Sequence, residues 1–143
     1  MAKVIKEKEM NVSAEALANV ILDFENYPEI LGEVKKAVTT WSTDKKDAKV
    51  NFELEVVKRF NYDLKFAIEY PAKIAWSLMK SDFFKENRGS WTIKKLGDKK
   101  CHVTYEVEVS FGFLVPGWVT KKLTEVNLPK MLEKFESAAK ARA

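Results

Sequence analysis

The chain has 143 residues and a mass of 16.4 kDa, the size of one domain, and its 46% hydrophobic content with nine Phe, four Trp and four Tyr excludes a disordered chain. The net charge of +4, from 25 Lys and Arg against 21 Asp and Glu, is spread along the chain and forms no basic stripe of the kind that nucleic-acid surfaces show. One Cys and one His exclude a disulfide framework and a zinc cluster.

Two observations concern the membrane and the cell compartment. No apolar run approaches the roughly 18 residues that a membrane span needs. Residues 1–8 carry three Lys and no apolar segment of the kind found in signal peptides. We therefore expect a cytoplasmic protein with a single domain over residues 1–143.

The N-terminal part of the chain predicts one strand followed by two short helices. Residues 3–12 alternate loosely and indicate a strand. Ser13 is a typical helix N-cap, and the spacing of the next apolar residues gives one apolar helix face. Pro28 suits the first turn of a second short helix, which Gly32 ends. The apolar face comprises Leu17, Val20, Ile21 and Phe24.

The middle of the chain predicts a long run of strands. Residues 34–41 form the first, and the polar run 42–47 is a turn. Even positions from 50 to 70 are apolar or aromatic except Lys58, which is the signature of strands with one apolar face. An unbroken strand of that length would span roughly 70 Å, so the chain must turn, and we expect the turn near Lys58. A loop with an odd number of residues, or a bulge, is needed there so that even-numbered residues face the same side of the sheet before and after the turn. Three further strands are marked by Ile74, Trp76 and Leu78, by Trp91 and Ile93, and by Val103, Tyr105, Val107 and Val109.

The C-terminal part of the chain has a helical pattern that starts at Pro116. Pro129 interrupts this pattern, and we expect a kink there because Pro cannot donate a hydrogen bond to the carbonyl of Glu125. This order of strands and helices predicts an α+β domain with a single antiparallel sheet. A long helix across the concave side of a curved sheet leaves a space between them. Large apolar side chains face that space, and they either fill the core or line a ligand cavity.

Several short motifs resemble one known family. They are residues 12–17 (Val-Ser-Ala-Glu-Ala-Leu), 23–29 (Asp-Phe-Glu-Asn-Tyr-Pro-Glu), 75–78 (Ala-Trp-Ser-Leu), 87–91 (Asn-Arg-Gly-Ser-Trp), Val115-Pro116, Leu128-Pro129 and Met131-Leu132. In this order and spacing they are similar to the polyketide cyclase/dehydrase and coenzyme Q-binding branch of the START-like (SRPBCC) superfamily. The resemblance implies a helix-grip fold, in which a curved seven-stranded antiparallel sheet wraps around a long C-terminal helix and two short helices follow the first strand.

The resemblance also implies a function, because proteins of this fold commonly hold an apolar small molecule between helix and sheet. We therefore expect this chain to bind or carry a lipid, a quinone or an aromatic polyketide-like molecule, without a cofactor or metal. Tyr62, Tyr70, Tyr105 and Asn127 are the candidate polar groups. The full set of expected ligand-binding residues is Phe52, Leu54, Tyr62, Phe66, Ile68, Tyr70, Trp76, Leu78, Trp91, Tyr105, Val107, Trp118, Leu123, Asn127 and Met131.

Two other functions stay open, namely a cyclase or dehydratase enzyme and a regulator that interacts with ribosomes or proteins, because members of the superfamily differ in activity. No residue is predicted to be catalytic. The alternation of its strand places His102 on the solvent-exposed face. No His or Asn partner can be placed beside Cys101, so we predict that Cys101 is a small packed residue. An apolar patch of Phe113, Leu114 and Trp118 suits transient membrane contact. No nucleic-acid partner is expected, and the sequence assigns neither ligand identity nor oligomeric state.

Overall fold

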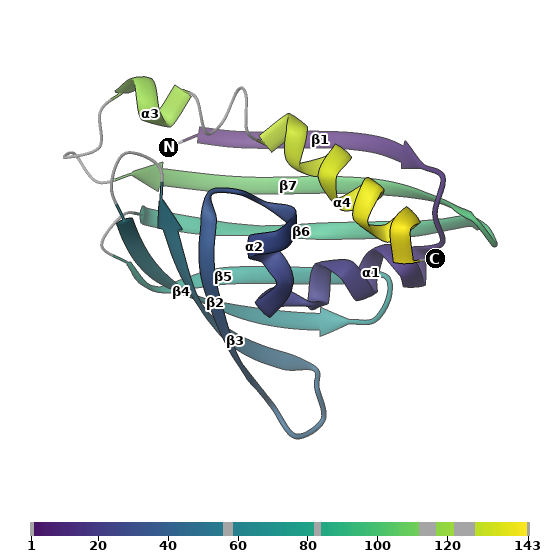
Figure 1. Cartoon of the computed structure of the whole chain (residues 1–143), viewed down its shortest axis with the longest axis horizontal. Helices are drawn as coiled ribbons and strands as arrows, with labels where there is room; N and C mark the ends of the chain where they lie inside the picture. The colour runs from purple at the N-terminus through teal and green to yellow at the C-terminus, as the bar shows by residue number, and fades with distance from the viewer. Residues whose placement is uncertain (1, 56–58, 82–83, 112–116, 122–127, 143) are drawn as a thin grey trace.

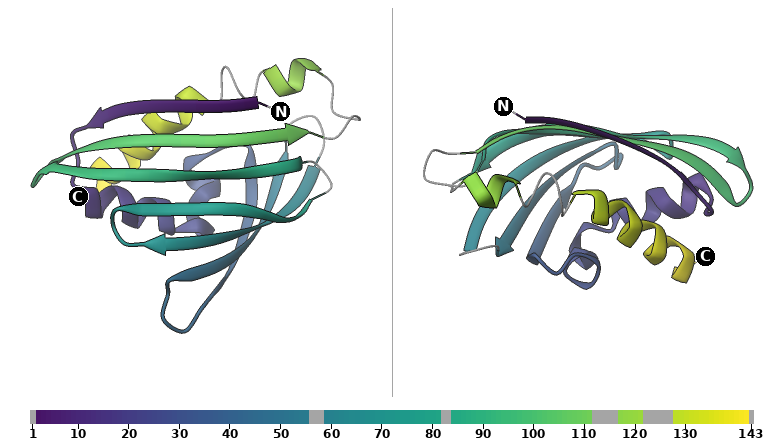
Figure 2. Two further views of the ribbon diagram at one scale, coloured as in Figure 1. Left: turned by 180° about the vertical axis from the view of Figure 1, so that it is seen from behind. Right: turned by 90° about the horizontal axis from the view of Figure 1, so that it is seen from above.

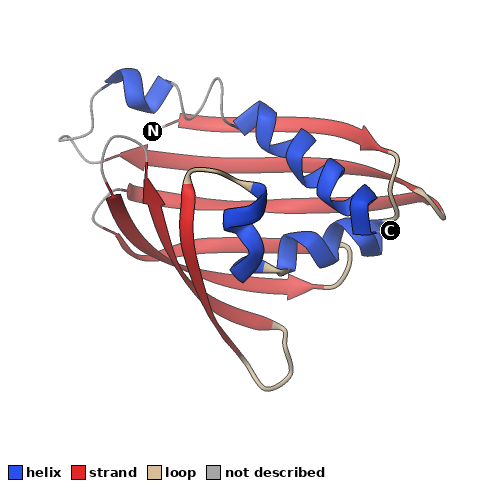
Figure 3. Cartoon of the chain, in the orientation of Figure 1, coloured by secondary structure: helices blue, strands red, loops and turns tan. Residues whose placement is uncertain are grey.

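The computed structural model describes residues 2–55, 59–81, 84–111, 117–121 and 128–142. Its centre is one seven-stranded antiparallel sheet with the strand order β1-β7-β6-β5-β4-β3-β2 (Figures 1 and 3). The strands are β1 (Ala2–Met10), β2 (Val34–Trp41), β3 (Asp47–Glu55), β4 (Arg59–Glu69), β5 (Lys73–Ser81), β6 (Phe84–Gly97) and β7 (Lys100–Phe111). Only β1 is displaced from chain order in the sheet, since it pairs with β7.

The helices lie on the concave side of the curved sheet, as the view from above shows for α1 and α4 (Figure 2). The described helices are α1 (Ala14–Leu22), the 3-10 turn η1 (Phe24–Asn26), α2 (Tyr27–Ile30), α3 (Gly117–Lys121) and α4 (Leu128–Arg142). A curved sheet that grips a C-terminal helix, with short helices after the first strand, confirms the predicted α+β helix-grip fold.

The short helices form as their sequence predicts. The Ser13 hydroxyl caps α1 by accepting a hydrogen bond of 3.0 Å from the Ala16 N–H, and Glu15 stands in the first turn, where the helix dipole favours an acid. The apolar face of α1 is buried, with Leu17 and Ile21 at 0% exposure. Pro28 lies in the first turn of α2, where its missing N–H breaks no helical bond.

Even-numbered residues face the same side of the sheet in β3 and β4, because an odd number of residues connects the two strands, as the alternating pattern requires. Glu55 pairs with Arg59, which leaves the three residues 56–58 between the two strands, and Val50 pairs with Leu64. Even-numbered residues of both strands therefore face the helices, and Phe52 and Phe66 are both buried. Lys58 itself lies outside the described residues.

The C-terminal helix is tied to the sheet by an apolar stripe and a charged group. Leu132, Phe135 and Ala139 are buried. The Glu136 carboxylate is 8% exposed, forms an ion pair of 3.0 Å with Lys8, and accepts a 3.1 Å hydrogen bond from the Asn11 N–H. These bonds fix α4 against the end of β1.

Parts of the predicted C-terminal helix cannot be compared with the structure. Pro116, Glu125 and Val126 lie outside the described residues, and the described helical segments begin at Gly117 and Leu128. Pro129 is the second residue of α4 as described, so the kink expected from its missing bond to Glu125 stays a prediction.

One residue of the alternating series is placed differently from the prediction. Tyr70 does not lie in the buried space between the sheet and the helices. It is 52% exposed, and its hydroxyl donates a 2.8 Å hydrogen bond to Asn19 Oδ1 on α1. The reason is that β4 ends at Glu69, so the chain at Tyr70 is already turning toward β5 and the strand alternation no longer applies.

Candidate functional site

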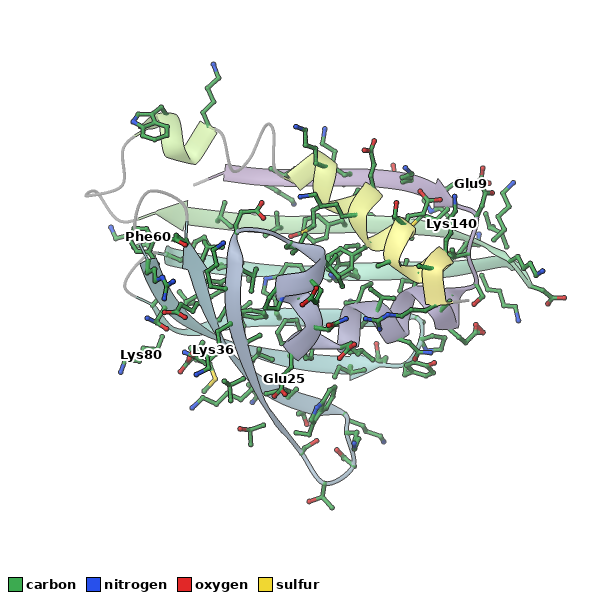
Figure 4. All side chains as sticks on the ribbon, viewed as in Figure 1. Glu9, Glu25, Lys36, Phe60, Lys80 and Lys140 are labelled. Atoms are coloured by element: carbon green, nitrogen blue, oxygen red, sulfur yellow. The ribbon has the colours of Figure 1, made fainter. Side chains whose placement is uncertain are left out.

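A cavity of about 120 Å³ lies between the concave face of the sheet and the helices, and it is open on one side. Its walls come from α2, α4, the segment that joins α2 to β2, and the six strands β2 to β7 of the sheet. The lining residues are Tyr27, Leu31, Val34, Phe52, Tyr62, Leu64, Phe66, Trp76, Asn87, Trp91, Tyr105, Met131 and Phe135. Figure 4 shows side chains filling the space between helices and sheet, while the labelled Lys36 and Lys80 extend outward.

Aromatic rings form most of the cavity wall. The Trp76 and Tyr105 rings are stacked with centroids 5.6 Å apart, and the Phe52 and Tyr62 rings are stacked at 5.4 Å. The Trp91 ring meets Tyr105 edge-on at 4.7 Å. Such a wall offers planar apolar surface at which a flat ligand ring can stack.

A glycine makes the position of one wall residue possible. Gly89 on β6 lies opposite Trp76 on β5 and opposite Val107 on β7. A Cβ atom at this position would lie 2.7 Å from the Trp76 ring and would also clash with the Glu106 carbonyl oxygen. The Trp76 ring therefore lies directly against the β6 backbone, which only a residue without a side chain allows.

The polar groups of the cavity differ in how well they are satisfied. Asn87 is 8% exposed, and its Oδ1 accepts a 2.9 Å hydrogen bond from Trp76 Nε1. The Tyr27 hydroxyl donates a 2.6 Å bond to the Ile21 carbonyl. Within the part of the chain that the structure describes, the hydroxyls of Tyr62 and Tyr105 have no hydrogen-bond partner. Two hydroxyls are therefore available to a bound molecule.

The electrostatics of the cavity keep its tyrosines protonated. Burial raises the pKa of Tyr27 and of Tyr105 above the ordinary value, and for Tyr62 burial acts together with the nearby Glu33 carboxylate. Glu33 precedes Val34 at the cavity wall, and its Oε2 is buried without a hydrogen-bond partner. At neutral pH the cavity thus holds protonated phenols, with one carboxylate close to Tyr62.

The structure brings together about half of the residues predicted to bind a ligand. Phe52, Tyr62, Phe66, Trp76, Trp91, Tyr105 and Met131 line the cavity. Leu54, Ile68 and Val107 are buried in the core, and Leu78 packs against it without lining the cavity. Tyr70 and Trp118 are exposed, at 52% and 61%. Leu123 and Asn127 lie outside the described residues.

Other lining residues were not predicted. Asn87 shares the odd parity of Trp91 and Ile93 on β6, and this signal places it on the inner face. Phe135 follows Met131 by one helical turn on α4. Tyr27 and Leu31 reach the cavity because α2 is folded under the sheet, which no local pattern indicates. Val34 and Leu64 complete the set.

The residues considered for catalysis lie away from the cavity. His102 is on the outer face of β7, with Nε2 3.6 Å from Glu7 Oε1, as its parity predicts. Cys101 is fully buried, and burial raises the pKa of its thiol to about 11, so it is a packed residue as expected. Among the described residues, no group of His, Cys, Asp and Glu could hold a metal ion.

No helix within the described ranges is long and apolar enough to cross a membrane.

A curved antiparallel sheet closed by a C-terminal helix over an apolar cavity defines the helix-grip class of proteins. The model of the family described as polyketide cyclase / dehydrase and lipid transport matches residues 10–136. The chain therefore belongs to this family. A search of curated proteins found no match.

Solved structures share this fold at low sequence identity. A START superfamily protein from Mycobacterium smegmatis is 24% identical, with 99% of each chain covered and a TM-score of 0.81. The Zhui aromatase/cyclase from Streptomyces sp. R1128 is 14% identical, with 99% of this chain and 94% of that chain covered and a TM-score of 0.83. A STAR-related lipid transfer protein from Xanthomonas axonopodis is 14% identical, with 96% and 85% covered and a TM-score of 0.79.

Proposed function

We propose that this protein binds or carries a hydrophobic small molecule, of the lipid, quinone or aromatic polyketide type, in the cavity between the sheet and α4. The observation that carries the proposal is an open cavity walled by aromatic rings with unpaired polar groups inside it. The family description names lipid transport, and neighbours of the same fold include a lipid transfer protein and an aromatase/cyclase, which supports the same ligand class.

The size of the cavity limits what it holds in this conformation. Its volume of about 120 Å³ is close to that of engineered apolar cavities of roughly 150 Å³ that bind benzene. A single aromatic ring fits without rearrangement. A larger ligand needs side chains at the open side to move, and Met131 on α4 is suited to this because its side chain is unbranched and half-buried.

Binding is favoured over catalysis by the side chains that line the cavity. A cyclase or dehydratase needs a positioned acid or base with a pKa near the working pH. The titratable lining groups among the described residues are tyrosines, and burial raises the pKa of each, so they exchange protons poorly at neutral pH. They serve better as hydrogen-bond donors that orient a ligand.

We also propose that the protein works in the cytoplasm and touches membranes transiently near Trp118. Trp118 on α3 is 61% exposed, and Lys121 on the same helix is exposed as well. An exposed Trp beside a Lys suits the surface of an anionic bilayer. Phe113 and Leu114, the other members of the predicted patch, lie outside the described residues. Sedimentation with phosphatidylglycerol vesicles, lost in Trp118→Ala, tests this.

Native mass spectrometry of detergent-free protein tests the main proposal, with an organic extract examined alongside. We expect an adduct of small-molecule mass in the wild type, or one formed with added naphthalene, menadione or palmitate. Trp91→Ala should lose it, because Trp91 forms part of the cavity wall. Trp41→Ala is the matched control, since Trp41 packs on Phe24 away from this cavity. A folded wild type that binds none of these molecules contradicts the proposal.

A further inference from the structure

The amide of Asn87 is held in one orientation inside the cavity. Its Oδ1 accepts the 2.9 Å hydrogen bond from Trp76 Nε1. An indole N–H can only donate, so it selects the oxygen of the amide and turns the NH₂ group the other way. The side chain is 8% exposed and lines the cavity, and the NH₂ group has no acceptor among the described residues.

A second donor lies in the same wall. The Tyr105 ring stacks on the Trp76 ring that holds Asn87, and Tyr105 is 5% exposed. Its hydroxyl has no hydrogen-bond partner in the described ranges, and burial raises its pKa, so the proton stays on the oxygen. Asn87 and Tyr105 thus present N–H and O–H donors from neighbouring strands, β6 and β7.

The fully buried side-chain atoms without a partner among the described residues are Glu33 Oε2 and Thr39 Oγ1, so the Asn87 NH₂ group and the Tyr105 hydroxyl remain accessible from the open cavity that both residues line. Both donors belong to residues that contact the Trp76 indole, which donates its hydrogen bond to Asn87 and stacks on the Tyr105 ring. The Trp76 N–H accounts for the Asn87 oxygen but not for its NH₂ group, which is left to bond to another acceptor. The arrangement is explained if a bound molecule supplies the acceptor.

We propose that Asn87 and Tyr105 bind a carbonyl or quinone oxygen of the ligand, so that the protein selects oxygenated aromatic molecules over hydrocarbons of the same shape. This inference rests on the proposed function and adds the polar group that the ligand carries. The ligand ring lies against the aromatic wall, and its oxygen accepts hydrogen bonds from the Asn87 NH₂ group and the Tyr105 hydroxyl.

Acetophenone and α-methylstyrene test this selection, because they have the same planar shape and differ only in C=O against C=CH₂. The quantity to measure is the ratio of their dissociation constants, by NMR titration, and the change of that ratio on mutation. The different hydrophobicity of the two probes cancels in that change. We expect Asn87→Leu and Tyr105→Phe each to reduce the relative preference for acetophenone about three- to tenfold, the worth of one hydrogen bond.

Tyr27→Phe is the matched control. Tyr27 lines the same cavity, but its hydroxyl is already bonded to the Ile21 carbonyl, so the ratio should stay at the wild-type value. A direct readout in the wild type is the NMR resonance of the Asn87 side-chain NH₂ group. It should shift downfield with acetophenone and not with α-methylstyrene, even if Asn87→Leu fails to fold.

The outcomes separate the two proposals. If both probes bind but Asn87→Leu and Tyr105→Phe keep the wild-type ratio, the recognition of a carbonyl is wrong and the cavity still binds ligands. If Asn87→Leu weakens both probes equally and the wild-type NH₂ resonance does not shift, Asn87 only supports Trp76, which also overturns the inference. If neither probe binds the wild type, the proposed function fails together with the inference.

Discussion

The two ends of the space under the sheet share strand β7 and differ in what fills them. At one end, which we call the packed end, the side chains are fully buried where α1 meets the sheet. They are Met10, Cys101 and Val103 of the sheet and Leu17 and Ile21 of α1. At the other, the cavity end, the rings of Phe52, Tyr62, Trp76 and Tyr105 surround an open space with polar groups in it.

The difference shows that the inner face of the sheet does not by itself decide between core and binding site. Both ends have an alternating apolar pattern. At the packed end, α1 presents small and branched apolar side chains that interlock with the sheet. At the cavity end, the sheet contributes large rigid rings, which leave a gap where they do not interlock. The packed end therefore stabilises the fold, and the cavity end is available for a ligand.

The largest effect is expected from truncation at the packed end. Leu17→Ala should reduce the free energy of unfolding by about 2–5 kcal/mol, because Leu17 is 0% exposed and its removal leaves a cavity. Met131→Ala is the matched change at the cavity end. It should cost less, since Met131 is half-buried beside existing space. Urea unfolding measures both, and equal losses would break the comparison between the two ends.

A change that adds volume at the cavity end should have the next largest effect. Gly89→Ala places a methyl group against the Trp76 ring and the β7 backbone, and overpacking of this kind costs about 1–3 kcal/mol. Because Trp76 must move, ligand binding should weaken as well. Gly32→Ala is the control, as no atom lies near its Cβ position. Thermal unfolding and probe titration that find no difference from wild type would show that the wall is looser than the structure describes.

A smaller effect is expected at the charged contact of the packed end. Burial alone would raise the pKa of the Glu136 carboxyl, but the hydrogen bonds from Lys8 and the Asn11 N–H outweigh it and lower the pKa below its ordinary 4.5. The contribution to stability is therefore present above about pH 4.5 and is lost as the pH falls below it. Glu136→Gln should cost about 1–2 kcal/mol at pH 7 and less at pH 3.

Urea unfolding of both proteins at the two pH values measures this difference. Glu133→Gln on the exposed side of α4 is the control, and it should leave the stability unchanged. A loss in Glu136→Gln that is the same at pH 3 and pH 7 would argue against a charge-dependent contact.

The smallest effect is expected from the buried thiol. Burial raises the pKa of Cys101 from an ordinary value of 9.0 to about 11, so the folded protein holds this proton more tightly than the unfolded chain. Stability from this group is complete below pH 9 and falls as the pH rises from about 9 to 11. Cys101→Ala should make the decline in that range shallower. In the native state a thiol reagent such as DTNB should react slowly at pH 8, and rapid reaction would contradict the burial.

The alternating strands could be predicted from the sequence because each residue's side is set by local backbone geometry. Leu64, Phe66 and Trp91 face inward as their parity requires. At other positions, an irregular pairing between two strands changes which side of the sheet a residue faces. A register shift between Val34 and Lys36 places Ala37 inward and leaves Val38 at 47% exposure. A bulge depends on how two strands pair, so one strand's pattern does not contain it.

The candidate site was only partly predictable for a similar reason. Phe52, Tyr62, Trp76 and Tyr105 were found because they lie on the inner face of regular strands. Whether an inner residue lines the cavity or the packed core depends on the helix above it, which separates Trp76 from Ile74 on the same strand. Asn87 was missed because its polarity suggests the outer face, and only its bond to Trp76 shows why it is buried.

By itself the sequence determined the elements, their order and the side of the sheet on which most residues lie, since helix caps, turn residues and the two-residue period act over a few positions. The tertiary structure decided where a gap remains between sheet and helices, which way the Asn87 amide is turned, and that the Tyr105 hydroxyl has no partner in the described part of the chain. These features depend on contacts between residues far apart in the chain, and local preferences do not encode such contacts.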